Sequence, residues 1–248
     1  MTESVELLAL AGAGLAAGFI NTLAGGGSLL TLPVLMLTGL DASVANATNR
    51  VGVLTGSLAA SHAFVRSRHL DPREVARLAG PTLLGAAVGA LAAALVPSDT
   101  LEPILLATLV AMALLLALRP SILAPSADEL PREPTGRALA ELAAAGFYAG
   151  FLQAGVGFIL LAVLAGRLRH GLVRANALKV ALVLPLTVVA LAIFWWQGLI
   201  EWVPGLAVGL GTAAGARLGV RFAVRHSAAL RWLVLAAVCA LAVAVALR

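Results

Sequence analysis

The sequence predicts an all-α polytopic membrane protein made of two inverted-topology repeats, and three observations support this prediction. Apolar residues make up 61% of the 248-residue chain and charged residues 12%, whereas soluble domains have about 45–50% and about 25%. The apolar residues form runs on the scale of membrane helices, which need about 20 residues. Glycine and asparagine patterns of the first half recur in the second half. A soluble globular domain is therefore excluded.

The apolar runs predict about eight to ten membrane segments. Two runs, 26–38 and 156–166, are too short to cross the hydrocarbon at about 1.5 Å per residue. We therefore expect each half to open with a broken-helix hairpin and to continue with three transmembrane helices. Two full spans in place of each hairpin would return the chain to the same side of the membrane. The runs are 5–23, 26–38, 42–64, 75–96, 101–118, 138–153, 156–166, 175–197, 203–220 and 229–247.

The charged residues predict the orientation of the chain. The net charge of +5 comes from arginines clustered in three short loops, which the positive-inside rule assigns to the cytoplasm rather than to nucleic-acid binding. These arginines are Arg66, Arg68, Arg73, Arg77, Arg167, Arg169, Arg174, Arg217, Arg221, Arg225 and Arg231. The turns at 97–102 and near Glu201 carry only acidic charge, so they are expected outside.

A proline-rich segment divides the chain into two halves. Residues 119–136 include Pro120, Pro125, Pro131 and Pro134 and predict a cytoplasmic linker between a first repeat, 1–118, and a second, 137–248. Counting spans from the basic loops puts both termini on the non-cytoplasmic side of the cell (plasma or inner) membrane. No cation precedes Arg50, so the first span is expected to be permanent rather than a signal peptide.

The internal repeat is visible at an offset of 132 residues. Residues 18–21 (GFIN) match 150–153 (GFLQ), and both are followed by glycines. Later, at an offset of 130 residues, the triplet 45–47 (ANA) matches 175–177 (ANA), and each triplet precedes a cation, Arg50 or Lys179. An odd number of crossings per half inverts the second half, an arrangement common in secondary transporters.

The same patterns resemble the sulfite exporter TauE/SafE family of membrane proteins. The resemblance rests on 18–27 (GFINTLAGGG), Pro33, Gly39, 45–49 (ANATN), 198–202 (GLIEW) and the glycine-rich stretch 211–219. It covers nearly the whole chain and implies export or uptake of sulfite, sulfonates or related small organic anions. The sequence departs from the family in its second half, where the glycine cluster is reduced to 155–158 (GVGF) and Leu178 replaces a polar residue.

Arg50 and Lys179, the only lysine, are the cations expected deepest in the membrane. An unpaired cation at mid-depth costs at least about 2.5–3.5 kcal/mol, and the central parts of the runs contain no Asp or Glu; Glu141 is nearest. One hypothesis is that a transported anion supplies the counter-charge. The alternative is that both side chains reach the headgroups or donate to helix-end carbonyls.

The remaining candidate substrate-binding residues surround the predicted helix breaks. Gly25, Gly26 and Gly27, with Ser28 as the expected N-cap of the next helix, would present backbone donors to an anion, or they would allow close helix packing. Buried amides and hydroxyls would bind oxyanion oxygens or satisfy the interrupted backbone. The other candidates are Asn21, Thr22, Asn46, Thr48, Asn49, Gln153, Gly155, Gly157 and Asn176.

These features favour a secondary transporter of a small anion that works by alternating access at a midplane site between the repeats. The alternatives are a non-transport membrane subunit, an intramembrane enzyme, or a transporter subunit that needs an energising partner. No nucleotide-binding motif, metal-ligand spacing or catalytic signature is present, so we predict no catalytic residue, no metal and no cofactor. The expected partners are the small anionic substrate and the lipid bilayer, without nucleic acid; a homo-oligomer is left open.

Overall fold

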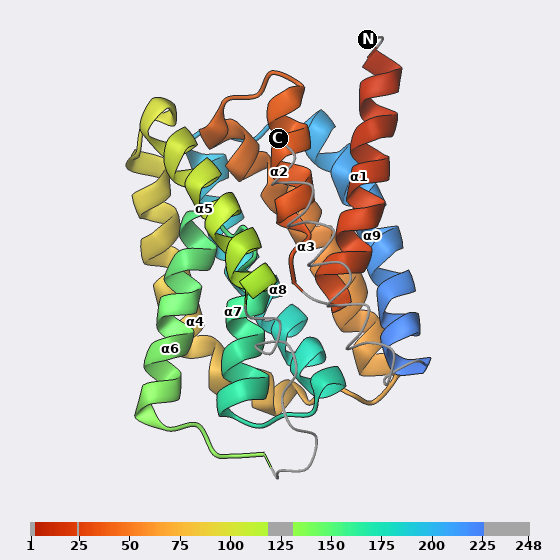
Figure 1. Ribbon diagram of the computed structural model, residues 1–248, viewed down its shortest axis with the longest axis vertical. Coiled ribbons are helices and arrows are strands. Elements are labelled where there is room, and N and C mark those ends of the chain that lie inside the picture. The colour runs from red at the N-terminus through yellow and green to blue at the C-terminus, as the bar shows by residue number, and fades with distance from the viewer. Residues whose placement is uncertain (1–2, 24, 119–130, 226–248) are drawn as a thin grey trace.

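The computed structural model describes residues 3–23, 25–118 and 131–225, and these form a bundle of helices without any strand (Figure 1). The all-α class predicted from the sequence is confirmed. Helices α1 (Glu3–Leu23), α4 (Pro72–Leu95), α8 (Leu172–Trp196) and α9 (Trp202–Arg225) are long and apolar enough to cross a membrane. The last predicted run, 229–247, and most of the linker lie outside the described residues.

The first half opens with a helix that breaks inside the bundle. Helix α1 ends at Leu23, and the short helix α2 (Ser28–Leu37) returns beside it. Both Leu23 and Ser28 are buried. Gly25, with φ of +96°, occupies the left-handed backbone region that favours glycine at the break. The hairpin predicted from the sequence is therefore present, but α1 is a full-length helix and only α2 is short.

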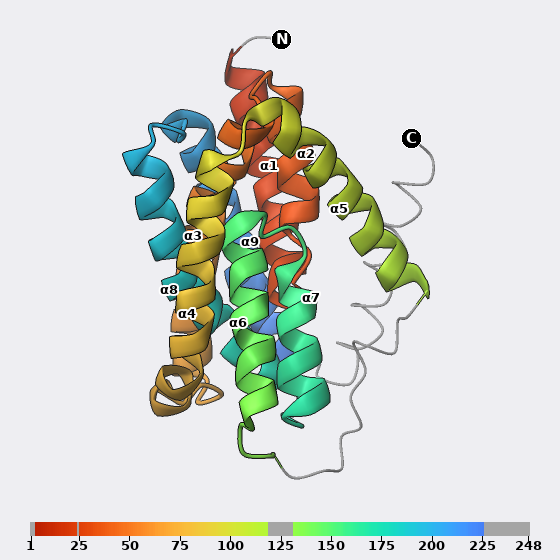
Figure 2. The ribbon, with the colours of Figure 1, turned by 90° about the vertical axis from the view of Figure 1, so that its left-hand side faces the viewer.

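The chain then crosses the bundle in longer helices. Helix α3 (Ala42–Arg66) runs its full length, and α4 follows a short turn. Asp71 caps α4 by accepting a hydrogen bond from the Arg73 N–H at 2.9 Å, and Pro72 occupies the first helical position, where its missing N–H costs nothing. Helix α5 (Ser98–Leu118) then slants across the outside of the bundle (Figure 2).

The second half repeats this order in the opposite direction. Helix α6 (Gly136–Phe151) starts at the end of the bundle opposite to the start of α1. A break follows, and α7 (Val156–Leu161) continues into the π-helical turn η2 (Ala162–Arg167). Helix α8 then occupies the position that α3 has in the first half. This opposite direction supports the inverted repeat, which stays a prediction.

Glycines pack α1 against α9 and α4 against α6. A Cβ atom on Gly211 or Gly215 would lie 2.0 Å from a carbonyl oxygen of α1, and one on Gly85 or Gly89 would lie 2.0 Å from a carbonyl oxygen of α6. Any larger residue would push these helices apart, so the glycines serve close helix packing, as small residues do in membranes. Each contact joins a helix of the first half to one of the second.

Charge is distributed unequally between the two ends of the bundle. The end at the top of Figure 1 has no Lys or Arg among the described residues, and its charges are Glu3, Glu6, Asp41, Asp99, Glu102 and Glu201. The opposite end carries all described arginines except Arg50. The exposed rings of Trp195, Trp196 and Trp202 flank the acidic turn, as an aromatic belt would. The assignment of the basic end to the cytoplasm stays a prediction that this pattern supports.

Candidate functional site

The two helix breaks meet at the centre of the protein. A Cβ atom on Gly157 would lie 2.2 Å from the Cα of Gly25, and one on Gly25 would lie 2.4 Å from the Cα of Gly157. The two backbones therefore touch where each half interrupts its first helix. Only glycine permits this approach.

Lys179 lies beside the end of α1. Its Nζ donates hydrogen bonds to the carbonyl oxygen of Asn21 at 2.7 Å, to that of Thr22 at 3.3 Å and to Oδ1 of Asn176 at 2.7 Å. An ammonium group has three donors, so all three are used. The positive charge lies at a helix C-terminus, where exposed carbonyls and the helix dipole favour a cation. Lys179 of the second half thus caps the broken helix of the first half.

Arg50 has the reciprocal position at the end of α6. Its guanidinium donates to the carbonyl oxygens of Ala149 and Gly150, the latter at 2.9 Å, and to Oε1 of Gln153 and Oδ1 of Asn46. The Phe194 ring lies 5.3 Å from the guanidinium carbon, within the range of a cation–π contact. Only Nε lacks a partner. Arg50 of the first half thus caps the broken helix of the second half.

Both cations are fully buried, and neither forms an ion pair with any Asp or Glu of the described chain. Neither reaches the ends of the bundle, and both donate to helix-end carbonyls. The two cations lie at nearly the same depth, because Arg50 is the ninth residue of α3 and Lys179 the eighth residue of α8. The charge is thus held by peptide dipoles and not by a carboxylate.

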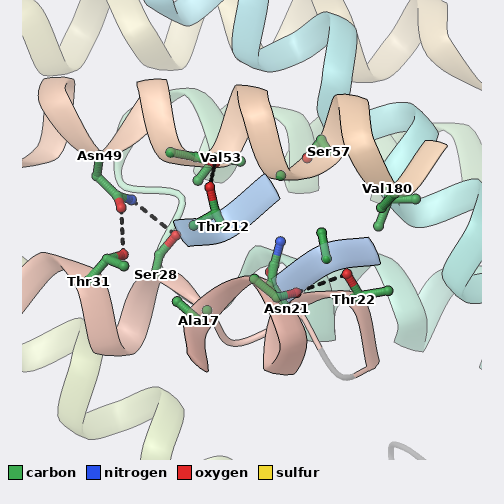
Figure 3. A pocket seen from close by; sticks show the side chains of 16 residues that line it. Ala17, Asn21, Thr22, Ser28, Thr31, Asn49, Val53, Ser57, Val180 and Thr212 are labelled. Atoms are coloured by element: carbon green, nitrogen blue, oxygen red, sulfur yellow. Dashed lines mark hydrogen bonds between the residues drawn. The ribbon is translucent and has the colours of Figure 1, made fainter. Parts of the chain in front are cut away.

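A narrow cavity with room for about one water molecule lies next to the first break (Figure 3). Its wall combines the end of α1, the start of α2, the middle of α3 and a turn of α9, with Val180 from α8. The polar side chains lining it are Asn21, Thr22, Ser28, Thr31, Asn49, Ser57 and Thr212. Glycines and alanines complete the wall, which leaves room between the helices.

The hydroxyls and amides of the cavity form a partly satisfied network. Asn49 donates to Oγ of Ser28 at 3.1 Å and accepts from the Thr31 hydroxyl. Thr212 donates to the Gly52 carbonyl oxygen at 2.6 Å. The buried Ser57 Oγ has no hydrogen-bond partner. Since an unsatisfied buried hydroxyl is costly, Ser57 is available to a ligand in the cavity.

A second, narrower cavity adjoins the first and reaches the second break. The two cavities share Asn21, Ser28, Val53 and Val180. The smaller one is also lined by Gln153, Gly157 and Lys179. No Asp or Glu lines either cavity, so this central region offers amide and hydroxyl groups beside a buried positive charge. Such a lining suits a small oxyanion.

The structure brings some predicted site residues to the cavities and places others around them. Asn46 donates to the Phe151 carbonyl oxygen at 2.8 Å and Asn176 to that of Leu172 at 3.1 Å, so both amides satisfy backbone and support a cation. Thr48 accepts from the Glu201 N–H at 3.0 Å, in the turn before α9, and lines neither cavity. Gly26 packs on the Phe158 ring and Gly155 on Met112.

The prediction that Ser28 is the N-cap of α2 is wrong. The N-cap is Gly27, without a side-chain hydrogen bond, and Ser28 is already the first helical residue. A Cβ atom on Gly27 would lie 2.5 Å from the Ala17 carbonyl oxygen, so the tight crossing of α1 and α2 requires glycine at the position where a hydroxyl cap would stand. The Ser28 hydroxyl is thereby turned toward Asn49 and the cavity.

Three residues that line the first cavity were not predicted from the sequence as site residues: Thr31, Ser57 and Thr212. Ser57 follows Asn49 and Val53 at intervals of four, so helical spacing puts all three on one face of α3. Thr31 lies one turn after Ser28 on α2. Thr212 lies within a glycine-rich stretch that indicates helix packing rather than a binding site. Its contact with the Gly52 carbonyl oxygen depends on the packing of α9 against α3, which the sequence does not show.

The chemistry of the site suits the binding of a small anion. The described residues contain no cluster of three or more His, Cys, Asp or Glu that would hold a metal ion. The groups at the cavity donate hydrogen bonds and supply charge, and none of those lining it is a carboxylate or histidine placed to move a proton.

Known proteins resemble this chain over most of its length. The profile of the family described as Sulfite exporter TauE/SafE matches residues 10–245. The chain is 32% identical to a "Probable membrane transporter protein ORF9" of Sinorhizobium sp over 213 residues, which cover 86% of this chain and 81% of that protein. No solved structure matches the chain.

Two further relatives carry similar descriptions. A "Probable membrane transporter protein" of Haemophilus influenzae is 29% identical over 225 residues, which cover 89% of this chain and 87% of the relative. The "Probable membrane transporter protein YfcA" of Escherichia coli K12 is 30% identical over 207 residues, which cover 83% of this chain and 76% of the relative. The similarity thus extends over most of each protein.

Proposed function

The chain belongs to the sulfite exporter TauE/SafE family and is a multi-pass membrane transporter; on this basis we propose that it is a secondary carrier of a small oxyanion, with sulfite and sulfonates as the substrate class. The observation that supports this proposal most is the pair of joined polar cavities at the meeting point of the two helix breaks, with Lys179 in the wall and no carboxylate lining either cavity.

The proposed substrate ligands are the amides and hydroxyls of the cavity wall. Asn21, Ser28, Asn49 and Ser57 offer donors at the cavity, and a tetrahedral or pyramidal oxyanion accepts several hydrogen bonds at once. Lys179 contributes mainly through its charge, because its three N–H groups are already bound to the protein. A negatively charged substrate beside Lys179 supplies the counter-charge that this buried lysine does not receive from any described residue.

The reciprocal caps suggest how the halves move. In alternating access, one repeat rocks against the other around a fixed site. Lys179 links α1 to α8, and Arg50 links α6 to α3, so both links cross between the proposed repeats, 1–118 and 137–248. Lys179 lines the smaller cavity, and Arg50 donates to Gln153, which also lines it. We propose that they act as the pivot of this motion.

The test is flux in a defined membrane. The purified full chain is reconstituted alone in liposomes, and the uptake of radiolabelled sulfite, a short alkyl sulfonate, acetate and chloride is compared. We expect saturable flux of sulfite or of the sulfonate that exceeds that of acetate and chloride. Flux that is equal for all four anions, or absent while the folded protein is present, would contradict the proposal.

A further inference from the structure

A basic groove lies between the ends of α3 and α9 at the arginine-rich end of the bundle. It has a volume of about 630 Å³ and is open at the protein surface. The basic side chains lining it are His62, Arg66, Arg217, Arg221 and Arg225. The remaining lining residues are small or apolar, apart from Ser67, and none is acidic. The groove shares no lining residue with the central cavities.

These arginines differ from others at the same end of the bundle. Arg77, Arg137, Arg167 and Arg174 each form an ion pair with a glutamate. The four arginines of the groove are exposed and have no hydrogen bond or ion pair with any other described residue. Four guanidinium groups therefore share one groove without a counter-charge from the described residues, which suits an anionic ligand.

Helical spacing places the basic side chains of the groove on one face of each helix. Arg217, Arg221 and Arg225 are four residues apart and so lie on one face of α9, with about 6 Å of rise between successive residues. His62 and Arg66 have the same spacing on α3. Farther from this end, the same two helices expose Leu58 and Leu210, with 58% and 75% of their surface accessible. The groove thus passes from a charged mouth to an apolar surface.

We propose that the groove binds the phosphodiester headgroup of an anionic phospholipid, with the acyl chains lying along the exposed leucines of α3 and α9. Guanidinium groups bind phosphate oxygens in a bidentate manner, and basic pockets between membrane helices bind such headgroups. A free phosphate would use only the charged mouth and would gain nothing from the apolar surface. The inference is independent of the transported substrate.

The first experiment measures stabilisation by lipid. The full chain in a neutral detergent is heated with phosphatidylglycerol, with phosphatidylcholine or with inorganic phosphate, because a ligand that binds the folded state raises the melting temperature. We expect a rise only with phosphatidylglycerol. The triple variant Arg217→Gln, Arg221→Gln, Arg225→Gln should bind that lipid about a hundred-fold more weakly, at about five-fold for each arginine removed.

The matched control is the triple variant Arg68→Gln, Arg73→Gln, Arg137→Gln, which removes the same charge at the same end but outside the groove. It should keep the lipid-induced rise. The proposal is overturned if both triple variants lose the rise equally, if the groove variant keeps it, or if inorganic phosphate acts as phosphatidylglycerol does.

A second experiment needs no variant. A photoreactive phosphatidylglycerol with its reactive group near the headgroup is cross-linked to the wild-type protein, and the labelled peptides are identified by mass spectrometry. Labelling confined to 59–67 and 217–225 is the expected result. Labelling spread evenly over the basic end would overturn the proposal even if the groove variant does not fold.

Discussion

The ammonium nitrogen of Lys179 lies 2.7 Å from the carbonyl oxygen of Asn21, so a cation of the second half closes the broken helix of the first half. The guanidinium of Arg50 does the same for Gly150 at the end of α6. The side chain of Asn21 lines both central cavities. The contact between Lys179 and Asn21 therefore both stabilises the helix break and holds a positive charge next to the proposed substrate site.

Replacement of Lys179 tests the role of its charge. Lys179→Met keeps the length of the side chain and removes the charge, so we expect the apparent KM for sulfite in liposomes to rise at least about ten-fold, which corresponds to about 1.4 kcal/mol. Lys179→Arg keeps the charge and should lose less. Folding is checked by size-exclusion chromatography. An unchanged KM in a folded Lys179→Met protein would refute the electrostatic role.

Arg50 is expected to matter first for stability. Arg50→Met leaves the carbonyls of Ala149 and Gly150 and the amide of Gln153 without their donor inside the protein, and each unsatisfied buried group costs about 1–3 kcal/mol. We expect the free energy of unfolding to fall by about 3 kcal/mol or more, which lowers the melting temperature by roughly 6–12 °C. Arg68→Gln, an exposed arginine, is the control and should change little.

The contact of the two breaks predicts a specific steric effect. Gly157→Ala places a methyl group 2.2 Å from the Cα of Gly25, so one backbone must move. We expect a large loss of folded, monodisperse protein in detergent. Gly80→Ala is the matched helical control, because nothing lies within 4 Å of its added Cβ. Equal yields and melting temperatures for the two variants would show that the close approach is not required.

A pH effect is expected at the basic end of the bundle. The loop residue His170 is buried, and its Nε2 lies 3.3 Å from Glu74, which also pairs with Arg174. Burial lowers the pKa of His170 below its ordinary value, against the opposing effect of Glu74. The neutral form therefore stabilises the fold above about pH 6.5, and this contribution is lost as the pH falls through the lowered pKa.

The measurement compares melting temperatures of wild-type and His170→Gln protein between pH 7 and pH 5. The wild type should lose more stability than the variant over this range, by no more than about 1.4 kcal/mol per pH unit, the limit for one proton. His69→Gln serves as control for a half-buried histidine of the neighbouring loop. Parallel curves for wild type and His170→Gln would contradict the assignment.

The sequence predicted the helical class, the position of nearly every helix and the breaks at Gly25 and Gly155. These features depend on apolar runs and local glycines, which a single chain displays directly. It did not predict which partner each buried cation has, because Lys179 bonds to Asn21, 158 residues away in the chain. Ser57 and Thr212 were missed for the same reason, since only the packing of α3, α9 and the helix break makes them neighbours.

The central claim is that a small oxyanion passes through the cavity lined by Ser57, and the most direct test is sulfite flux through Ser57→Leu protein in liposomes. Ser61→Leu is the matched control, because Ser61 is one turn away on α3, has an equally unpartnered buried hydroxyl and lines neither central cavity. Filling the cavity should reduce flux at least about ten-fold, since added side-chain volume in a closely packed site displaces its contents, while Ser61→Leu stays near the wild-type rate. Wild-type flux through folded Ser57→Leu protein would contradict the account.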